Sequence, residues 1–120
     1  MLPTHFVEVD LQLTAYRALP PNWDRLGSSP GNEEAIDNAQ YFINALPPTI
    51  AAPTPALSSD GSVILLWDRY PAYVRVQFDG GTLYEFEGQG PWGEHVFGEE
   101  TLIEPLDDQL LRMLEFMTSL

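Results

Sequence analysis

The chain is 120 residues long, the size of one domain with a single core, and 44% of its residues are hydrophobic. It has no cysteine, which excludes disulfide bonds and thiolate metal sites. Its 18 acidic residues oppose five basic ones, all arginine, for a net charge of −13. This balance disfavours direct nucleic-acid binding, because phosphate-binding surfaces need cations.

Apolar and polar residues alternate along residues 6–13, "FVEVDLQL". This period of two predicts a half-buried strand, with these residues on its inner face: Val7, Val9, Leu11 and Leu13. The alternative is a helix that continues through "LTAYRAL", with Leu11, Ala15 and Leu19 on one face. Two prolines, at positions 20 and 21, end either element.

The next element is predicted to be a helix of about four turns that begins after Asn32. Asn32 suits an N-cap, and Glu33 and Glu34 place negative charge in the first turn, where the helix dipole favours it. The apolar residues at helical spacing are Ala35, Ile36, Ala39, Phe42, Ile43 and Leu46. Pro47 and Pro48 end this helix.

Three strands are predicted after a proline-rich connector at residues 47–62, which we expect to pack as extended surface chain. "SVILLWDRY" and "AYVRVQF" are rich in β-branched and aromatic residues, and "TLYEFEG" alternates. Asp79, Gly80 and Gly81 form a hairpin turn between the second strand and the third. These three strands predict an antiparallel meander.

The last part of the chain predicts a glycine-rich segment, residues 88–105, and then a helix. Either "EHVFG" or "TLIEP" within the segment could form a short edge strand. The helix begins near Pro105, with these residues on its apolar face: Leu106, Leu110, Met113, Leu114 and Met117. The predicted fold is therefore a single α+β domain, residues 1–120, in which two amphipathic helices pack on one face of an antiparallel β-sheet of three to five strands.

A Trp-Asp pair lies in the loop "LPPNWDRLGSSP", residues 19–30. We interpret the pair as structural: Trp23 wedges the loop into the core, and Asp24 bonds to loop amides or to Arg25. On this interpretation Trp23→Ala lowers stability by about 3–5 kcal/mol. The alternative is that Asp24 is a catalytic acid, although no second titratable group is tied to it by spacing.

The same loop carries a resemblance. "LPPNWD", a helix that closes in "LPP", and "SDGSVILLW" resemble a group of small, uncharacterised bacterial proteins with a Leu-Pro-x-Asn-Trp-Asp-Gly motif. The resemblance covers residues 19–86, and the chain departs from the motif at Arg25 and Leu26. Because we know of no activity for the group, the resemblance implies a fold and no function.

Catalytic and metal-binding patterns are sparse. The two histidines, His5 and His95, have no helical ligand spacing, and no Gly-x-Ser-x-Gly nucleophile motif is present. Glu94, His95, Glu99 and Glu100 form a possible hard-metal cluster, but without the ligand spacing of a calcium loop. We therefore predict no metal and no cofactor, and a protein that is not an enzyme. A small hydrolase or metal-dependent enzyme that uses Asp24 and His95 is the alternative.

The acidic, aromatic segment from residue 79 to residue 108 contains no arginine or lysine. Aromatic side chains in a glycine-rich loop suit interface anchors, and carboxylates around them would pair with arginines of a partner. The predicted partner-binding residues are Glu85, Glu87, Trp92, Glu94, Phe97, Glu99, Glu100, Glu104, Asp107 and Asp108. Two alternatives remain: Trp92 and Phe97 fold back over the core while the acids keep the protein soluble, or the acid excess reflects a halophilic source.

These observations predict a non-enzymatic acidic protein that binds and inhibits a basic protein partner, one that normally binds nucleic acid. A phage or mobile-element anti-defence inhibitor (anti-CRISPR-like) that mimics nucleic acid is the leading hypothesis, and an antitoxin or immunity protein is the alternative. An exposed sheet edge could also support a homodimer. The start of the chain lacks signal-peptide features, and no apolar run approaches the roughly 20 residues of a membrane span, so we expect a cytoplasmic protein.

Overall fold

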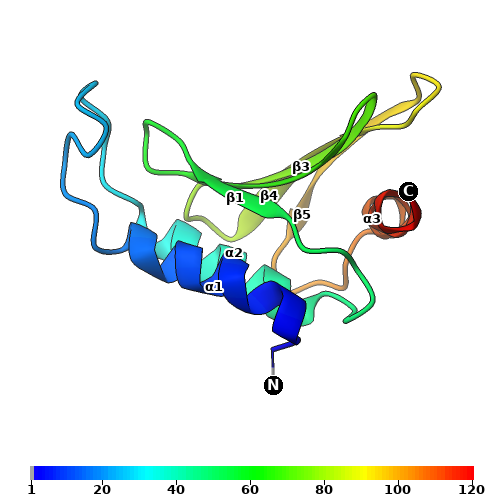
Figure 1. Ribbon diagram of the computed structural model, residues 1–120, viewed down its shortest axis with the longest axis horizontal. Coiled ribbons are helices and arrows are strands. Elements are labelled where there is room, and N and C mark those ends of the chain that lie inside the picture. Colours follow the sequence, from blue (N-terminus) through cyan, green and yellow to red (C-terminus); the bar gives the residue numbers. More distant parts are fainter. Residues whose placement is uncertain (1) are drawn as a thin grey trace.

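The computed structural model describes residues 2–120 as a five-stranded antiparallel sheet with three helices (Figure 1). The helices are α1 (Thr4–Tyr16), α2 (Glu33–Ala45) and α3 (Asp108–Ser119). The strands are β1 (Thr54–Leu57), β2 (Val63–Arg69), β3 (Ala72–Phe78), β4 (Leu83–Gln89) and β5 (His95–Thr101). The α+β fold class predicted from the sequence is confirmed, with one helix more than expected.

The additional helix is α1, so the prediction of a strand at residues 6–13 is wrong. Its buried side chains, at spacings of three and four residues, are Phe6, Val9, Leu13 and Tyr16. Val7 and Leu11, which the alternating pattern placed inside, are 41% and 63% exposed. Val9 and Leu13 are four residues apart and fit both periods, so the short apolar pattern did not separate a strand from a helix. The face of the alternative helix, with Leu11 and Ala15, is also exposed.

Helix α2 is confirmed in its cap and in its buried face. The Asn32 side chain accepts a hydrogen bond from the Ala35 backbone N–H at 3.0 Å. All six apolar residues assigned to this helix face are buried, including Leu46 at the C-cap. The N-cap of α3 is Asp107, whose carboxylate accepts from the backbone N–H groups of Gln109 and Leu110. Helix α3 buries Leu110, Leu114 and Met117 in the core.

The sheet has the strand order β1-β2-β3-β4-β5, with every neighbouring pair antiparallel. The predicted meander is its centre, and the hairpin turn between β3 and β4 has Gly80 at a positive φ of 97°. The proline-rich connector is not only extended surface chain, because it contains β1, which pairs with β2. At the other edge β5 follows the "EHVFG" alternative, and "TLIEP" contributes only Thr101.

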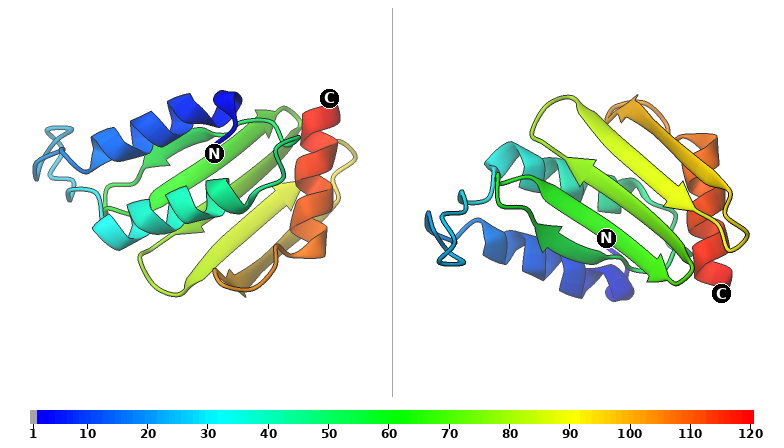
Figure 2. Two further views of the ribbon diagram at one scale, coloured as in Figure 1. Left: turned by 90° about the horizontal axis from the view of Figure 1, so that it is seen from below. Right: turned by 90° about the horizontal axis from the view of Figure 1, so that it is seen from above.

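All three helices lie on one side of the sheet (Figures 1 and 2). Alternate residues of β2, β3 and β4 point toward them and form the core with the helix faces. Phe42 of α2, for example, packs edge-on against Phe78 and Tyr84 at centroid distances of 5.4 and 5.2 Å. The opposite side of the sheet has no helix over it within residues 2–120 (Figure 2, right). None of the described helices has the length and apolar character needed to cross a membrane.

The Trp-Asp loop differs from its prediction in one respect. Trp23 is half-buried and lies outside the core, so it does not wedge the loop into the interior. Its indole N–H donates to the backbone carbonyl of Ser29 at 2.7 Å, which closes the loop on itself. Asp24 ties the loop as expected, because its carboxylate accepts from the Leu26 N–H and from the Ser28 hydroxyl. The local polar contacts, not burial of the indole, therefore hold this loop.

Candidate functional site

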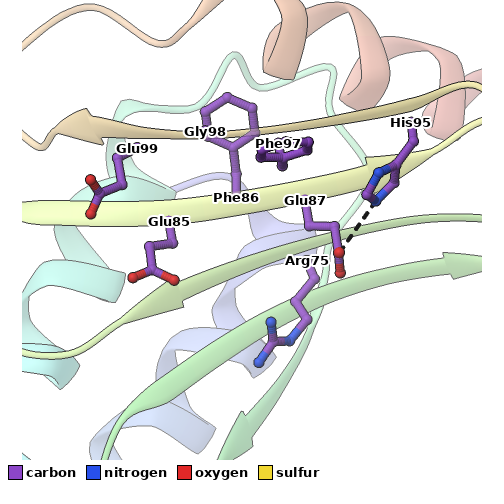
Figure 3. A pocket seen from close by; sticks show the side chains of 8 residues that line it. All are labelled: Arg75, Glu85, Phe86, Glu87, His95, Phe97, Gly98 and Glu99. Atoms are coloured by element: carbon purple, nitrogen blue, oxygen red, sulfur yellow. Dashed lines mark hydrogen bonds and ion pairs between the residues drawn. The ribbon is translucent and has the colours of Figure 1, made fainter.

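One side of the sheet faces away from the helices and is named here the open face. It brings together charged and aromatic side chains of three strands. Because strand side chains alternate between faces, the residues opposite the core positions of β3, β4 and β5 share this surface. They include Arg75, Glu85, Glu87, His95, Phe97 and Glu99. These side chains line a shallow hollow of about 510 Å³ (Figure 3).

Two of the groups on the open face form an ion pair when the histidine is protonated. The Nε2 atom of His95 lies 3.2 Å from a carboxylate oxygen of Glu87, across the β4–β5 pair (Figure 3). Arg75 lies opposite Glu87 on the other side, but its guanidinium donates to the side-chain oxygen of Gln77 at 2.6 Å. The negative charge of Glu87 is therefore partly compensated by His95 and Arg75.

A pair of carboxylates on the same face has no such compensation. Glu85 on β4 and Glu99 on β5 are direct cross-strand partners. Like charges in this arrangement destabilise a sheet, and within the described residues neither carboxylate makes an ion pair or a hydrogen bond. A cationic group placed between them would relieve that repulsion.

Phe97 gives the open face an apolar centre. Its side chain is 74% exposed and lies directly across from Glu87 in the register. The neighbouring residue, Gly98, faces the core, where the Phe86 ring packs so closely that a Cβ at position 98 would lie 3.0 Å from the ring. Phe86 thus packs against β5 on the core side of the sheet. Phe97 lies on the opposite side, at the surface, and does not fold back over the core.

The remaining predicted partner-binding residues lie elsewhere. Trp92, at the turn between β4 and β5, is 84% exposed and lines a groove with Arg112, Met113 and Phe116 of α3, on the helix side of the sheet. The Glu94 carboxylate folds back against Gly90 in the same turn.

The last four acidic residues do not join the open face either. Glu100 falls on the core-facing side of the β5 alternation, and Glu104 lies in the segment between β5 and α3. Asp107 caps α3, and Asp108 is in the first turn of that helix. The structure therefore divides the ten predicted residues, and four of them share the open face: Glu85, Glu87, Phe97 and Glu99.

Asp24 and His95, the pair of the enzyme alternative, belong to segments at opposite ends of the molecule (Figure 1). The Ser28 hydroxyl, together with the Leu26 amide, holds the pKa of Asp24 below its ordinary 3.8. A lowered pKa suits a loop-tying carboxylate and not a general acid. No group of three or more His, Asp or Glu side chains in residues 2–120 is placed to hold a metal ion.

Sequence reasoning missed one unusual group, the hydroxyl of Tyr84. The residue is 2% exposed, and its hydroxyl has no hydrogen-bond partner among the described residues. Burial, and then the Glu100 carboxylate, raise the pKa of Tyr84 to about 12. The Asp107 backbone N–H acts in the opposite direction and lowers this pKa, although it makes no hydrogen bond of normal geometry with the hydroxyl. Alternation indicated that Tyr84 is inside, but only the folded packing shows that its polar end is unpaired.

Comparison with known proteins does not assign the site. No protein-family model matches the chain, and no similar curated protein or solved structure was found.

Proposed function

We propose that this protein is a non-enzymatic interaction protein that binds a basic protein partner through the open face of its sheet. The observation that carries the proposal is the exposed Phe97, which lies among Glu85, Glu87 and Glu99 on a side that no described helix covers. Arginine suits this surface, because a guanidinium stacks on an aromatic ring and binds a carboxylate through two hydrogen bonds.

The uncompensated repulsion between Glu85 and Glu99 supports a cationic partner in particular. Both carboxylates are exposed, and an arginine between them would gain two attractive interactions while removing a repulsive one. The net charge of −13 adds a long-range field that speeds the encounter with a basic surface. A protein that normally binds nucleic acid has such a surface, so the carboxylates would take the place of phosphates. An inhibitor of a defence protein from a phage or mobile element, or an antitoxin, would act in this way.

The test is a binding titration of the full chain with a labelled arginine-rich peptide and a lysine-rich peptide of the same length. The arginine peptide is expected to bind more tightly, and its affinity is expected to fall as salt rises. Equal affinity for both peptides, or an affinity that is flat from low to high salt, would contradict the proposal.

A matched pair of variants locates the binding surface. Glu99→Gln removes one negative charge from the open face and is expected to weaken arginine-peptide binding about tenfold. Glu8→Gln removes the same charge from an exposed position on α1, on the helix side, and is expected to leave binding almost unchanged. An equal loss in both variants would mean that only net charge matters and that the open face is not the site.

A further inference from the structure

The outer edge of β5 carries backbone groups that have no hydrogen-bond partner among the described residues. Hydrogen bonds from Gly90 N–H to Glu94 C=O (2.8 Å) and from Leu102 N–H to Thr82 C=O (3.0 Å) frame the β4–β5 ladder. In an antiparallel pair, hydrogen-bonded and non-hydrogen-bonded positions alternate. The even-numbered residues of β5 therefore bond to β4, and the odd-numbered residues direct their N–H and C=O groups away from the sheet.

Three consecutive odd-numbered positions, His95, Phe97 and Glu99, have both of these backbone groups free of partners within residues 2–120. Their side chains are also exposed. The other sheet edge is different, because β1 has four residues, includes Pro55, and packs against α1. Short strands and prolines protect a sheet edge from pairing, and β5, with seven residues and no proline, has neither protection.

The sequence of this edge is self-complementary around Phe97. If a second copy pairs antiparallel with a two-fold axis at Phe97, then Phe97 faces Phe97 of the second copy and His95 faces its Glu99. All three free positions then become hydrogen-bonded pairs, each of which exchanges two bonds. A shift of the axis to residue 99 would set Glu99 against Glu99 instead, which like charge disfavours.

Exposed apolar side chains at the two ends of β5 fit the same axis. Trp92 lies five residues before Phe97 and is 84% exposed, and Ile103 lies six residues after it and is 85% exposed. A two-fold rotation about Phe97 brings each end of the strand beside the opposite end of the second strand. The turn that carries Trp92 in one copy then comes beside the segment that carries Ile103 in the other.

We propose that this protein forms a homodimer through the β5 edge, with Phe97 on the two-fold axis, so that the two sheets join into one. The dimer does not depend on a basic partner. In the dimer the two open faces become continuous, which would double the acidic surface. Because both copies carry a net charge of −13, dimerisation is opposed by repulsion and is expected to strengthen as salt rises.

Sedimentation equilibrium of the full chain, from micromolar to millimolar concentration at low and high salt, tests the proposal. A monomer–dimer equilibrium that tightens with salt is expected. Phe97→Lys, which places two cations on the axis, should weaken dimerisation by about tenfold or more. Glu85→Gln, on the same face but one strand away from the edge, should not weaken it. A monomer under all conditions, or a dimer that Phe97→Lys leaves intact, would overturn the proposal.

A charge-swap experiment checks the register. His95→Glu should weaken the dimer, because it sets glutamate against Glu99 of the second copy, and addition of Glu99→Arg should restore it. Failure of the double variant to restore a dimer weakened by His95→Glu would overturn the register. The opposite salt dependences separate the two proposals: a chain that binds arginine peptide but stays monomeric refutes only the dimer, and a dimer that binds no basic peptide refutes only the proposed function.

Discussion

Some side chains of this protein bury a polar atom that has no hydrogen-bond partner among the described residues. The Tyr84 hydroxyl is such an atom, although the ring of Tyr84 packs well against Phe42. A buried hydroxyl that makes no hydrogen bond costs stability, because it has lost its interactions with water. The ring and the hydroxyl of this one residue therefore act in opposite directions.

Tyr84→Phe is accordingly expected to raise the free energy of unfolding by about 1 kcal/mol. Urea unfolding of both proteins would measure the change, with Tyr16→Phe as a control at a core tyrosine whose hydroxyl is not among the buried unpaired atoms. A loss of stability in Tyr84→Phe would show that the hydroxyl is hydrogen-bonded after all.

The Trp-Asp loop gives a pH prediction. Because the Ser28 hydroxyl bonds to the Asp24 carboxylate, the pKa of Asp24 is lower in the folded loop than its ordinary 3.8. The stabilisation from this carboxylate is then fully present above pH 3.8 and is lost as pH falls through the lower, folded pKa. Ser28→Ala should move the pKa of Asp24 up toward 3.8, as measured by NMR titration of its carboxyl carbon. Asp60, which bonds to Ser62 in a similar way, should keep its lowered pKa in that variant.

The structure also changes the stability loss expected for Trp23→Ala. The cost of about 3–5 kcal/mol for Trp23→Ala assumed a fully buried indole. In the structure the indole is half-buried and bonds to Ser29 within its own loop, so a smaller loss of stability is expected.

Among the elements, α1 shows where a local pattern misleads. The pattern of residues 6–13 suits a strand, yet the helix buries residues three and four apart and leaves Val7 and Leu11 in water. By contrast, α2 was predictable in detail, because an N-cap, two acidic residues in the first turn and six apolar positions all agree on one helix.

A pair of leucines two residues apart tests the α1 helix in solution. Leu13 is completely buried, so Leu13→Ala should lower the free energy of unfolding by about 2–5 kcal/mol. Leu11 is 63% exposed, and Leu11→Ala should change it by less than about 0.5 kcal/mol. In a strand both leucines would point to the same face, so similar losses from the two variants in chemical denaturation would contradict the helix.

Charge dominates the molecule as a whole. At a net charge of −13 the folded chain repels itself, and the described residues contain only two pairs to offset this, Arg17 with Asp37 and His95 with Glu87. Salt weakens repulsion between exposed charges, because the screening length falls from about 30 Å at 0.01 M to about 8 Å at 0.15 M.

The melting temperature of the dilute protein is therefore expected to rise over this range of sodium chloride. Calorimetry or circular dichroism would measure it, and sucrose at matched osmolality would control for effects that do not depend on charge. A melting temperature that falls with salt would mean that attractive ion pairs outweigh the repulsion.

The sequence by itself determined the period of α2 and α3, the β2–β4 meander, the α+β class and the acidic character, because caps, turn residues and local spacing act over a few neighbouring positions. Only the tertiary structure decided that residues 4–16 are a helix, that Phe97 and Trp92 lie on opposite sides of the sheet, and that β5 is an outer strand of the sheet. These features depend on which surfaces remain after distant segments have paired and packed. Neither a charged surface nor a sheet edge has a periodic pattern in the sequence. The ten acidic and aromatic residues therefore looked like one site in the sequence, whereas the fold places them on separate surfaces.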